Sequence, residues 1–265
     1  MIKQHTSSIV SPKAIIADNV EIAPYSLIED NVEIGEGTYI GPHVCVYSGA
    51  RIGKNTRIFQ SASISHAPQD LKYEGEPTEV FIGDNVTIHE FVTVHRGTSA
   101  LLSNQGTGKT TIGNDVLLMA YSHIAHDCYI GNNCILANAV QLGGHVYIDD
   151  WSILGGGVLV HQFCVVGKHI MVGGGYRIVK DIPPFLLAAG EPLRYEGLNV
   201  VGLRRHGFTS QQVTAIKKIY AILFSKSYNV SQAKTIISEQ FAENEYAKDI
   251  LEFINSSKRG ILGKS

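Results

Sequence analysis

Residues 112–178 read IGNDVL LMAYSH IAHDCY IGNNCI LANAVQ LGGHVY IDDWSI LGGGVL VHQFCV VGKHIM VGGGYR I, and each block of six begins with Ile, Leu or Val. The same spacing runs from Val10 to Ile64 and from Ile82 to Val94. Twenty-five positions share this register, because ten lie in the first of these runs, three in the second and twelve in 112–178. A repeat of this extent indicates that one small structural unit stacks on its own copies.

The content of one hexad predicts a short strand followed by a turn. The residue after the aliphatic is often Gly, and Asn or Asp follows in segments such as IGDNVT and IGNNCI. These residues favour tight turns. The fourth residue after the aliphatic is usually small, so two side chains of each hexad point inward. A period of six fits neither an α-helix nor a heptad, whereas it fits a parallel β-helix with three hexads per coil and coils about 4.8 Å apart.

The composition is that of a folded protein with reduced cysteines. Of 265 residues, 44% are hydrophobic and 17% charged, and the formal net charge is −2. Disordered chains combine low apolarity with high charge, and chains that coat nucleic acid are basic, so both classes are excluded. Cys128, Cys134 and Cys164 fall on inward positions, and these residues and Cys45 form no CxxC pair. We therefore expect reduced thiols rather than a disulfide framework.

The chain shows no sign of export or membrane insertion. Its first residues, MIKQHTSSIVSPKAII, lack the apolar stretch of a signal peptide. No run of the sequence approaches the roughly 18 apolar residues of a membrane span. We expect a soluble, cytoplasmic protein with no membrane span and no nucleic-acid partner.

Two segments depart from the hexads, near 66–80 and near 96–110, and both are polar and rich in Gly, Pro or Asn. The aliphatic residues that flank each segment are 18 residues apart, or three hexads, so the register resumes unchanged. We expect both segments to be loops that leave the prism, and loops on a rigid scaffold often carry function.

The repeat ends near Ile182, where Pro183 and Pro184 stop strand pairing. From residue 199 on, ten Lys or Arg stand against five Asp or Glu, a net charge of +5, whereas residues 1–198 carry twelve against nineteen, a net charge of −7. Apolar spacing predicts a helix after the candidate caps Thr209 and Ser210, and further helices near Ser231 and Asn244. We predict a mainly β protein, with a parallel β-helix over 1–192 and a small α-helical C-terminal domain over 193–265.

Several segments resemble one enzyme family over nearly the whole chain. The segments QDLKYEGEPT, HIAHDCYIGNNCILAN, GGGVLVHQFC, HIMVGGG, DIPPF and GLNVVGLRRHGF resemble the UDP-N-acetylglucosamine acyltransferases, the first enzymes of lipid A synthesis. The resemblance implies a left-handed β-helix, although the usual crossover is right-handed. It implies transfer of an (R)-3-hydroxyacyl group from acyl carrier protein to the glucosamine 3-OH of UDP-N-acetylglucosamine. It also implies a homotrimer with active sites between subunits and no metal or cofactor.

His126 is the candidate general base. Attack of a sugar hydroxyl on a thioester needs a base for the proton and donors for the oxyanion. An imidazole exchanges protons at neutral pH, and His126 occupies an outward turn position beside Asp127, which is placed to orient the ring. Gly144 and Gln162 follow 18 and 36 residues later and share the same edge. The resemblance implies that His126 is the base and that Gly144 supplies an oxyanion N–H.

Further histidines lie within about two coils of His126, which argues against a merely solvated side chain. These histidines are His123, His145 and His161, and Gln162 lies on the same edge. The resemblance implies that all four residues contact substrate. It also implies that Gly174, together with Met171, measures acyl-chain length. Glycine there leaves the groove open and favours a longer chain.

Charged and polar residues outside the repeat complete the implied site. In the first loop, Asp70 is implied to recognise the sugar or the acyl 3-hydroxyl, and Lys72 to recognise phosphate or phosphopantetheine. Asn199, Arg204 and Arg205 are implied to serve the nucleotide and the acidic carrier protein. The fork geometry of arginine suits a diphosphate, and the basic tail suits an acidic partner.

Three alternatives compete with this interpretation. A γ-class carbonic anhydrase would share the prism, but its zinc histidines include a pair five residues apart, and none of the eleven histidines here has such a partner. An ice-binding scaffold would need a regular outward row of Thr. Another hexapeptide acyltransferase would use acyl-CoA or a 3-amino sugar. Val201 and the segment Glu191–Arg194 depart from the family pattern, so the nucleotide contacts are expected to differ there.

Overall fold

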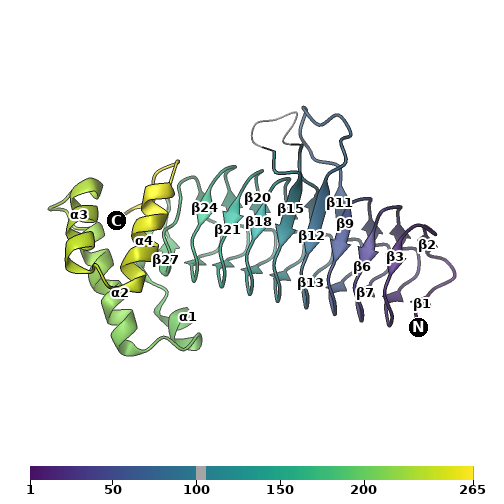
Figure 1. Ribbon diagram of the computed structural model, residues 1–265, viewed down its shortest axis with the longest axis horizontal. Coiled ribbons are helices and arrows are strands. Elements are labelled where there is room, and N and C mark those ends of the chain that lie inside the picture. Colours follow the sequence, from purple (N-terminus) through teal and green to yellow (C-terminus); the bar gives the residue numbers. More distant parts are fainter. Residues whose placement is uncertain (100–105, 265) are drawn as a thin grey trace.

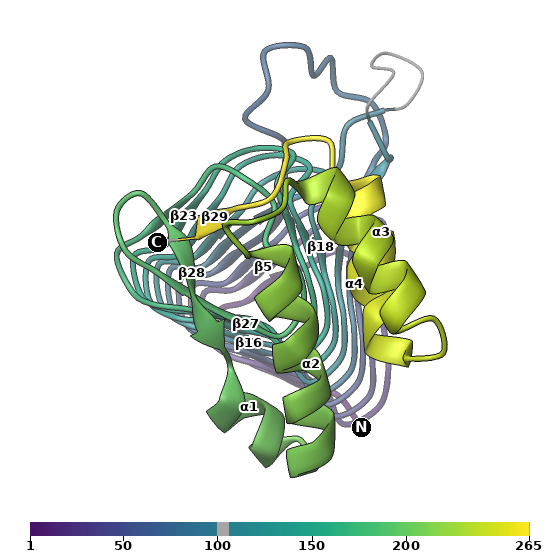
Figure 2. The ribbon, with the colours of Figure 1, turned by 90° about the vertical axis from the view of Figure 1, so that its left-hand side faces the viewer.

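The protein is a triangular prism of stacked coils with a cluster of helices at one end, as the computed structural model shows for residues 1–99 and 106–264 (Figure 1). Each coil contributes one short strand to each of three sheets, which we call A, B and C. Seen along the prism axis, the three sheets form the sides of a triangle (Figure 2). The predicted parallel β-helix is confirmed.

Sheet A contains twelve strands, ordered along the axis: β1 (Lys3–Gln4), β4 (Glu21–Ile22), β7 (Tyr39–Ile40), β10 (Arg57–Ile58), β13 (Thr87–Ile88), β16 (Leu117–Leu118), β19 (Ile135–Leu136), β22 (Ile153–Leu154), β25 (Met171–Val172), β27 (Leu186–Ala189), β28 (Arg194–Leu198) and β29 (Gly263–Lys264). Sheet B contains nine: β2 (Ile9–Val10), β5 (Leu27–Ile28), β8 (Cys45–Val46), β11 (Ser63–His66), β14 (Thr93–His95), β17 (His123–Ile124), β20 (Gln141–Leu142), β23 (Leu159–Val160) and β26 (Arg177–Ile178). Sheet C contains eight: β3 (Ile15–Ile16), β6 (Glu33–Ile34), β9 (Ala50–Ile52), β12 (Glu79–Ile82), β15 (Lys109–Ile112), β18 (Tyr129–Ile130), β21 (Tyr147–Ile148) and β24 (Val165–Val166).

The repeat-defining aliphatics form the core. All of them are buried except Val10 and Ile16, which lie in the first coil and have stacked neighbours on one side only. Cys128, Cys134 and Cys164 are buried among them as free thiols, as predicted. Burial of stacked aliphatic side chains is the main stabilising contribution in such a fold.

Coil length sets which side chains share an edge. Between ordinary coils the register advances by 18 residues, as in the pairing of His123 with Gln141. It advances by 30 where a long connection intervenes, as in Thr93 with His123. The first connection, residues 67–78, and the described parts of the second, 96–99 and 106–108, leave the prism on the same side (Figure 1). Residues 100–105 of the predicted second loop lie outside the described residues.

The far end of the prism is closed by strands and helices. After the Val166–Ile182 bridge, β27 and β28 pair antiparallel and extend sheet A. Four helices follow: α1 (Val200–Arg205), α2 (Ser210–Leu223), α3 (Val230–Gln240) and α4 (Glu245–Ser256). The division at residue 192 stays a prediction. No helix in the described part of the chain is long and apolar enough to cross a membrane.

The helix starts follow side-chain caps. Thr209 and Asn229 each form a capping box with the glutamine three residues later, and Asn244 caps α4. The three predicted helices are therefore confirmed within one or two residues. The short α1, capped by Asn199, was not predicted, because six residues are too few to show an apolar period.

Candidate active site

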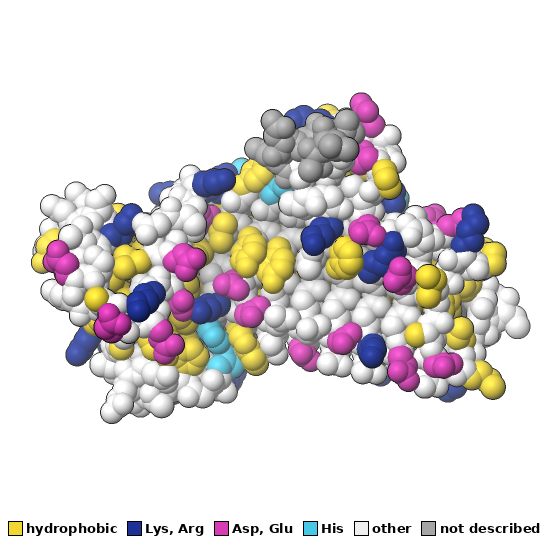
Figure 3. All heavy atoms as spheres, viewed as in Figure 1, with side chains coloured by type: hydrophobic (Ala, Val, Ile, Leu, Met, Phe, Trp, Pro, Cys, Tyr) yellow, Lys and Arg dark blue, Asp and Glu magenta, His cyan; other side chains and the backbone are white. Residues whose placement is uncertain are grey.

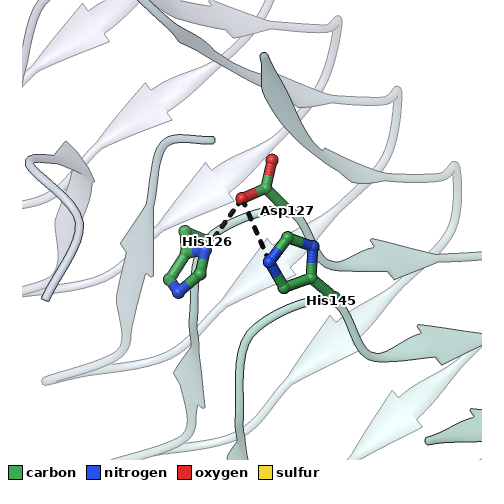
Figure 4. Close-up of side chains that lie close together, drawn as sticks. All are labelled: His126, Asp127 and His145. Atoms are coloured by element: carbon green, nitrogen blue, oxygen red, sulfur yellow. Dashed lines mark hydrogen bonds and ion pairs between the residues drawn. The ribbon is translucent and has the colours of Figure 1, made fainter. Parts of the chain in front are cut away.

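Two histidines and one aspartate meet at the corner between sheets B and C (Figure 4). His126 and Asp127 lie in the turn between β17 and β18, and His145 lies in the same turn one coil further on. The His126 Nδ1 and Asp127 Oδ2 atoms are 2.8 Å apart, and His145 Nε2 is 3.8 Å from the same oxygen. Asp127 and His145 have φ of 58° and 60°, the corner conformation that turns each coil. The predicted pairing of His126 with Asp127 is present.

Asp127 is held by the second loop as well as by His126. The hydroxyl of Thr98 donates to Oδ2 at 2.7 Å, and the backbone N–H of Thr107 donates to Oδ1 at 2.7 Å. Burial raises the pKa of Asp127, but the hydrogen bonds from His126, Thr107 and Thr98 outweigh it and lower the pKa to about 2. Asp127 is therefore a carboxylate at neutral pH, fixed in place by a loop that projects from the prism.

An ionised carboxylate only accepts hydrogen bonds, so the contact with Asp127 places the proton of a neutral His126 on Nδ1. The other nitrogen, Nε2, then carries a lone pair. Gly144 lies against this nitrogen, because a Cβ built on Gly144 would be 2.6 Å from His126 Nε2. Within the described residues, the Gly144 N–H makes no hydrogen bond. A base and a free donor thus stand side by side.

A groove of about 480 Å³ opens beside His126 and runs along sheet B across β14, β17, β20, β23 and β26. One end carries the polar side chains of Gln69, His95 and His123. The other carries the hydrophobic side chains of Leu159 and Val179, with Arg177 beside Leu159. Four further lining residues are ones that the sequence analysis predicted for the site: His126, Gly144, His161 and Gln162. The arrangement can hold an elongated ligand that has a polar head and an apolar tail.

Two further histidines of the groove are oriented through Nδ1. His123 Nδ1 is 2.7 Å from the hydroxyl of Thr93, and His161 Nδ1 is 3.0 Å from the carbonyl of Gln162. Burial and the neighbouring His126 lower the pKa of His123. These contacts leave the Nε2 atoms as the remaining polar groups of both rings.

His145 lies on the opposite side of the corner. Its ring meets the edge of His126, with centroids 5.0 Å apart, and stacks on Phe163. It lines a second groove, of about 940 Å³, between sheet C and α4 rather than the first. Burial lowers the pKa of His145, while the carboxylates of Asp127 and Asp70 act in the opposite direction. The Asp70 Oδ1 accepts from the Lys72 N–H at 3.0 Å.

The remaining predicted residues are not brought to the groove within one chain. Asn199 is buried, caps α1 by accepting from the Gly202 N–H, and donates to the carbonyl of His169. Others lie outside the groove lining, and they are Lys72, Arg204, Arg205, Met171 and Gly174. Gly174 is exposed in the turn between β25 and β26, and a Cβ there would be 3.0 Å from the Gly156 carbonyl oxygen.

The donor atoms of His126, Asp127 and His145 lie within 4.8 Å of one another, the spacing of a metal site. The carboxylate, however, is already fully used: Oδ1 accepts from Thr107, and Oδ2 accepts from Thr98 and His126. A metal ion would have to displace these donors. The geometry instead resembles a carboxylate that orients an imidazole for proton transfer.

Sequence reasoning missed several residues of this site, among them Thr93, Thr98, Thr107 and His95; Gln69 and Arg177 of the groove lining were not predicted either. The Thr93 hydroxyl holds His123, whereas the Thr98 hydroxyl and the Thr107 backbone N–H hold Asp127. His95 lines the groove. The hexad register gave no signal for Thr98 and Thr107, because both lie in a loop outside it.

Comparisons with known proteins match the whole chain. The family model "Udp N-acetylglucosamine O-acyltransferase; Domain 2" matches residues 181–262, and the model for bacterial transferase hexapeptide repeats matches 13–48 and 109–144. The acyl-[acyl-carrier-protein]–UDP-N-acetylglucosamine O-acyltransferase of Janthinobacterium sp. (strain Marseille) is 48% identical over 262 residues, 97% of this chain and 98% of that protein. The same-named protein of Xylella fastidiosa is 45% identical over 259 residues, 97% of each chain.

The structural comparison agrees. The crystal structure of Francisella novicida UDP-N-acetylglucosamine acyltransferase superposes with a TM-score of 0.94 at 41% identity, covering 100% of this chain and 94% of the other. The predicted fold class, a left-handed parallel β-helix followed by a small α-helical C-terminal domain, is confirmed. With relatives this similar over nearly its full length, the chain belongs to the acyl-[acyl-carrier-protein]–UDP-N-acetylglucosamine O-acyltransferase family.

Proposed function

We propose that this protein transfers an (R)-3-hydroxyacyl group from acyl carrier protein to the 3-OH of the glucosamine of UDP-N-acetylglucosamine, the first step of lipid A and hence lipopolysaccharide biosynthesis. The observation that carries the proposal is the Asp127-oriented imidazole of His126, whose Nε2 faces Gly144 beside an elongated groove. Family membership gives the same reaction, since the relatives named above are O-acyltransferases of this kind.

The proposed reaction is one direct transfer. His126 Nε2 takes the proton of the sugar 3-OH while that oxygen attacks the thioester carbon, and the Gly144 N–H stabilises the oxyanion. The Asp127 carboxylate stabilises the imidazolium that forms. The attack gives a tetrahedral intermediate. When this intermediate collapses, the C–S bond breaks and the leaving thiolate takes the proton from His126. An ester and a free thiol result, with no covalent bond to the enzyme.

We assign the two substrates to the two ends of the groove. Its polar end, near His123 and Gln69, suits the sugar, and His161 and Gln162 lie beside the reacting centre. The hydrophobic side chains of Leu159 and Val179 at its other end suit the acyl chain, and Arg177 lines the same end. His145, which adjoins His126 on the other side of the corner, and Asp70 of the first loop are assigned to the sugar or the acyl 3-hydroxyl.

The residues outside the groove are assigned to a site completed by a second protomer of a homotrimer. Lys72, Asn199, Arg204 and Arg205 then serve phosphates, nucleotide and carrier protein, and Gly174 with Met171 limits the acyl chain. Two surface features support assembly. The wall of the groove is open, with Leu159 42% exposed, and hydrophobic side chains gather over β18 and β21 of sheet C (Figure 3), where Tyr129 and Tyr147 stack.

We also place the protein in the cytoplasm. Its four cysteines are free, and burial raises the pKa of Cys128 and Cys134 to about 12. Unpaired core thiols are typical of a reducing compartment.

The direct test is product analysis. Purified protein is given UDP-N-acetylglucosamine and a ladder of (R)-3-hydroxyacyl carrier proteins, and products are identified by mass. The proposal predicts one 3-O-acyl ester with a defined chain-length preference. Turnover only with acyl-CoA, or only with a 3-amino analogue of the acceptor, would contradict it.

A further inference from the structure

His95 stands at the polar end of the groove and has no part in the mechanism above. It is the last residue of β14, one coil before His126, and lines the groove with His123 and Gln69. Its side chain is almost fully buried, with 4% of the residue exposed. Its ring contacts the edge of His123, with centroids 5.0 Å apart, and lies 5.8 Å from that of His66.

The hydrogen bonding of His95 differs from that of the neighbouring rings. His123, His126 and His161 each have a partner at Nδ1, namely a hydroxyl, a carboxylate and a carbonyl. The Nδ1 of His95 is buried and has no partner among residues 1–99 and 106–264. An unpaired N–H at such a position is costlier than an unpaired lone pair, which places the ring proton on Nε2. Of the two ring nitrogens, only Nδ1 is both buried and without a partner. Nε2 is therefore the nitrogen that is available to a ligand in the groove.

The ring is neutral at the pH of the proposed reaction. Burial lowers the pKa of His95 to about 4, and the nearby His123, His66 and His126 act in the same direction. His95 is therefore a fixed, uncharged N–H donor, whereas His126, with its proton on Nδ1, presents an acceptor. The groove thus contains one imidazole that presents a hydrogen-bond donor and a nearby imidazole that presents an acceptor.

We propose that His95 is a substrate-binding residue whose Nε2–H donates to a neutral oxygen of the substrate next to the reacting hydroxyl. This proposal rests on the proposed function. A neutral donor suits a hydroxyl or carbonyl oxygen rather than a phosphate, which attracts cationic side chains. Two such oxygens lie near the reacting centre: the 4-hydroxyl of the sugar, next to the reacting 3-hydroxyl, and the 3-hydroxyl of the acyl donor.

The test compares His95→Phe, which keeps a ring but removes both nitrogens, with His95→Gln, which restores an N–H near Nε2. His66→Phe is the control, since His66 belongs to the same row of rings but does not line the groove. We expect His95→Phe to raise one substrate KM about tenfold, His95→Gln to recover part of that loss, and His66→Phe to match the wild type. Melting temperatures show whether each variant is folded, and His95→Ala replaces His95→Phe if the latter does not fold.

Substrate analogues identify the oxygen. In the wild type, we expect weaker binding of whichever analogue lacks the oxygen that His95 contacts: a 4-deoxy acceptor or a donor without its 3-hydroxyl. In His95→Phe, the analogue that lacks the oxygen bound by His95 should bind as well as the complete substrate, because that hydrogen bond is already absent. Wild-type KM for both substrates in His95→Phe, or an equal loss in His66→Phe, would overturn the role of His95 while leaving the proposed function standing. Absence of wild-type turnover would overturn both.

Discussion

Gly144 lies directly over the reactive nitrogen of His126, so closely that a Cβ on Gly144 would stand 2.6 Å from His126 Nε2. The two residues are 18 apart in sequence and belong to successive coils. The stacking distance of a β-helix therefore places a residue without a side chain beside the base. It leaves room for a substrate oxygen and keeps a backbone N–H in reach.

We predict that Gly144→Ala lowers kcat/KM by about 10²-fold, because the added methyl displaces the His126 ring from its working position. Gly156→Ala is the matched control, since Gly156 holds the same place in its hexad but a Cβ there would only meet the Asn138 carbonyl oxygen at 3.3 Å. Steady-state kinetics and thermal melts of both variants provide the comparison. Equal activities in the two would show that Gly144 has no special place beside the base.

The Thr98 hydroxyl donates to the buried Asp127 carboxylate. Thr98→Val removes a hydrogen bond to a charged group, worth roughly 1.5–3 kcal/mol, and we expect lower stability and about tenfold lower kcat. Thr110→Val is the control, because the Thr110 hydroxyl is buried without a partner among the described residues. Its replacement should leave both quantities almost unchanged. Denaturant unfolding and kinetics measure the two effects, and a Thr98→Val enzyme with full kcat would separate the loop from catalysis.

His169 gives a stability prediction that depends on pH. Burial lowers the pKa of His169 to about 4, aided by His206 and Lys168 and opposed by Asp150. The unfolded chain titrates near 6.5, so below that pH the unfolded state binds a proton that the folded state does not. The stability from neutral His169 is therefore complete above pH 6.5 and is lost as the pH falls toward 4. Melting temperatures between pH 7 and 4 should fall less steeply in His169→Phe than in the wild type, and parallel curves would contradict the assignment.

Gly174→Met tests the proposed measure of acyl length. The residue is exposed in its turn, so a longer side chain can extend over the surface where the acyl chain would end. We expect the preferred donor to become shorter with little change in melting temperature. Competition among carrier proteins of different chain length shows the preference, and an unchanged product distribution would remove Gly174 from the site.

The fold could be predicted from the sequence because each six-residue repeat corresponds to one strand and one turn of the prism. The aliphatic at every sixth position specifies the core, and the distance of 18 residues specifies which residues share an edge, as with His126 and Gly144. Loops carry no such register, so the anchoring of Asp127 by Thr98 and Thr107 had no sequence signal.

The helical end was only partly predictable for the same reason. Thr209 and Asn244 mark helix starts by their capping chemistry, but β28 and β29 pair across about 70 residues, and no local pattern specifies that contact. In the homotrimer that we propose, Asn199, Arg204 and Arg205 reach the site across a contact between protomers, and the period of one chain does not specify such a contact.

The central claim is that His126 removes the proton of the sugar hydroxyl. The most direct measurement is the kcat/KM of His126→Ala with acyl carrier protein thioester and UDP-N-acetylglucosamine, alongside its melting temperature and oligomeric state. His89→Ala is the control, since His89 stacks on Phe59 on another face of the prism. We predict a loss of about 10²- to 10⁴-fold in His126→Ala, with assembly and stability close to the wild type and no loss in His89→Ala. Near-normal turnover of a folded His126→Ala protein would contradict the account.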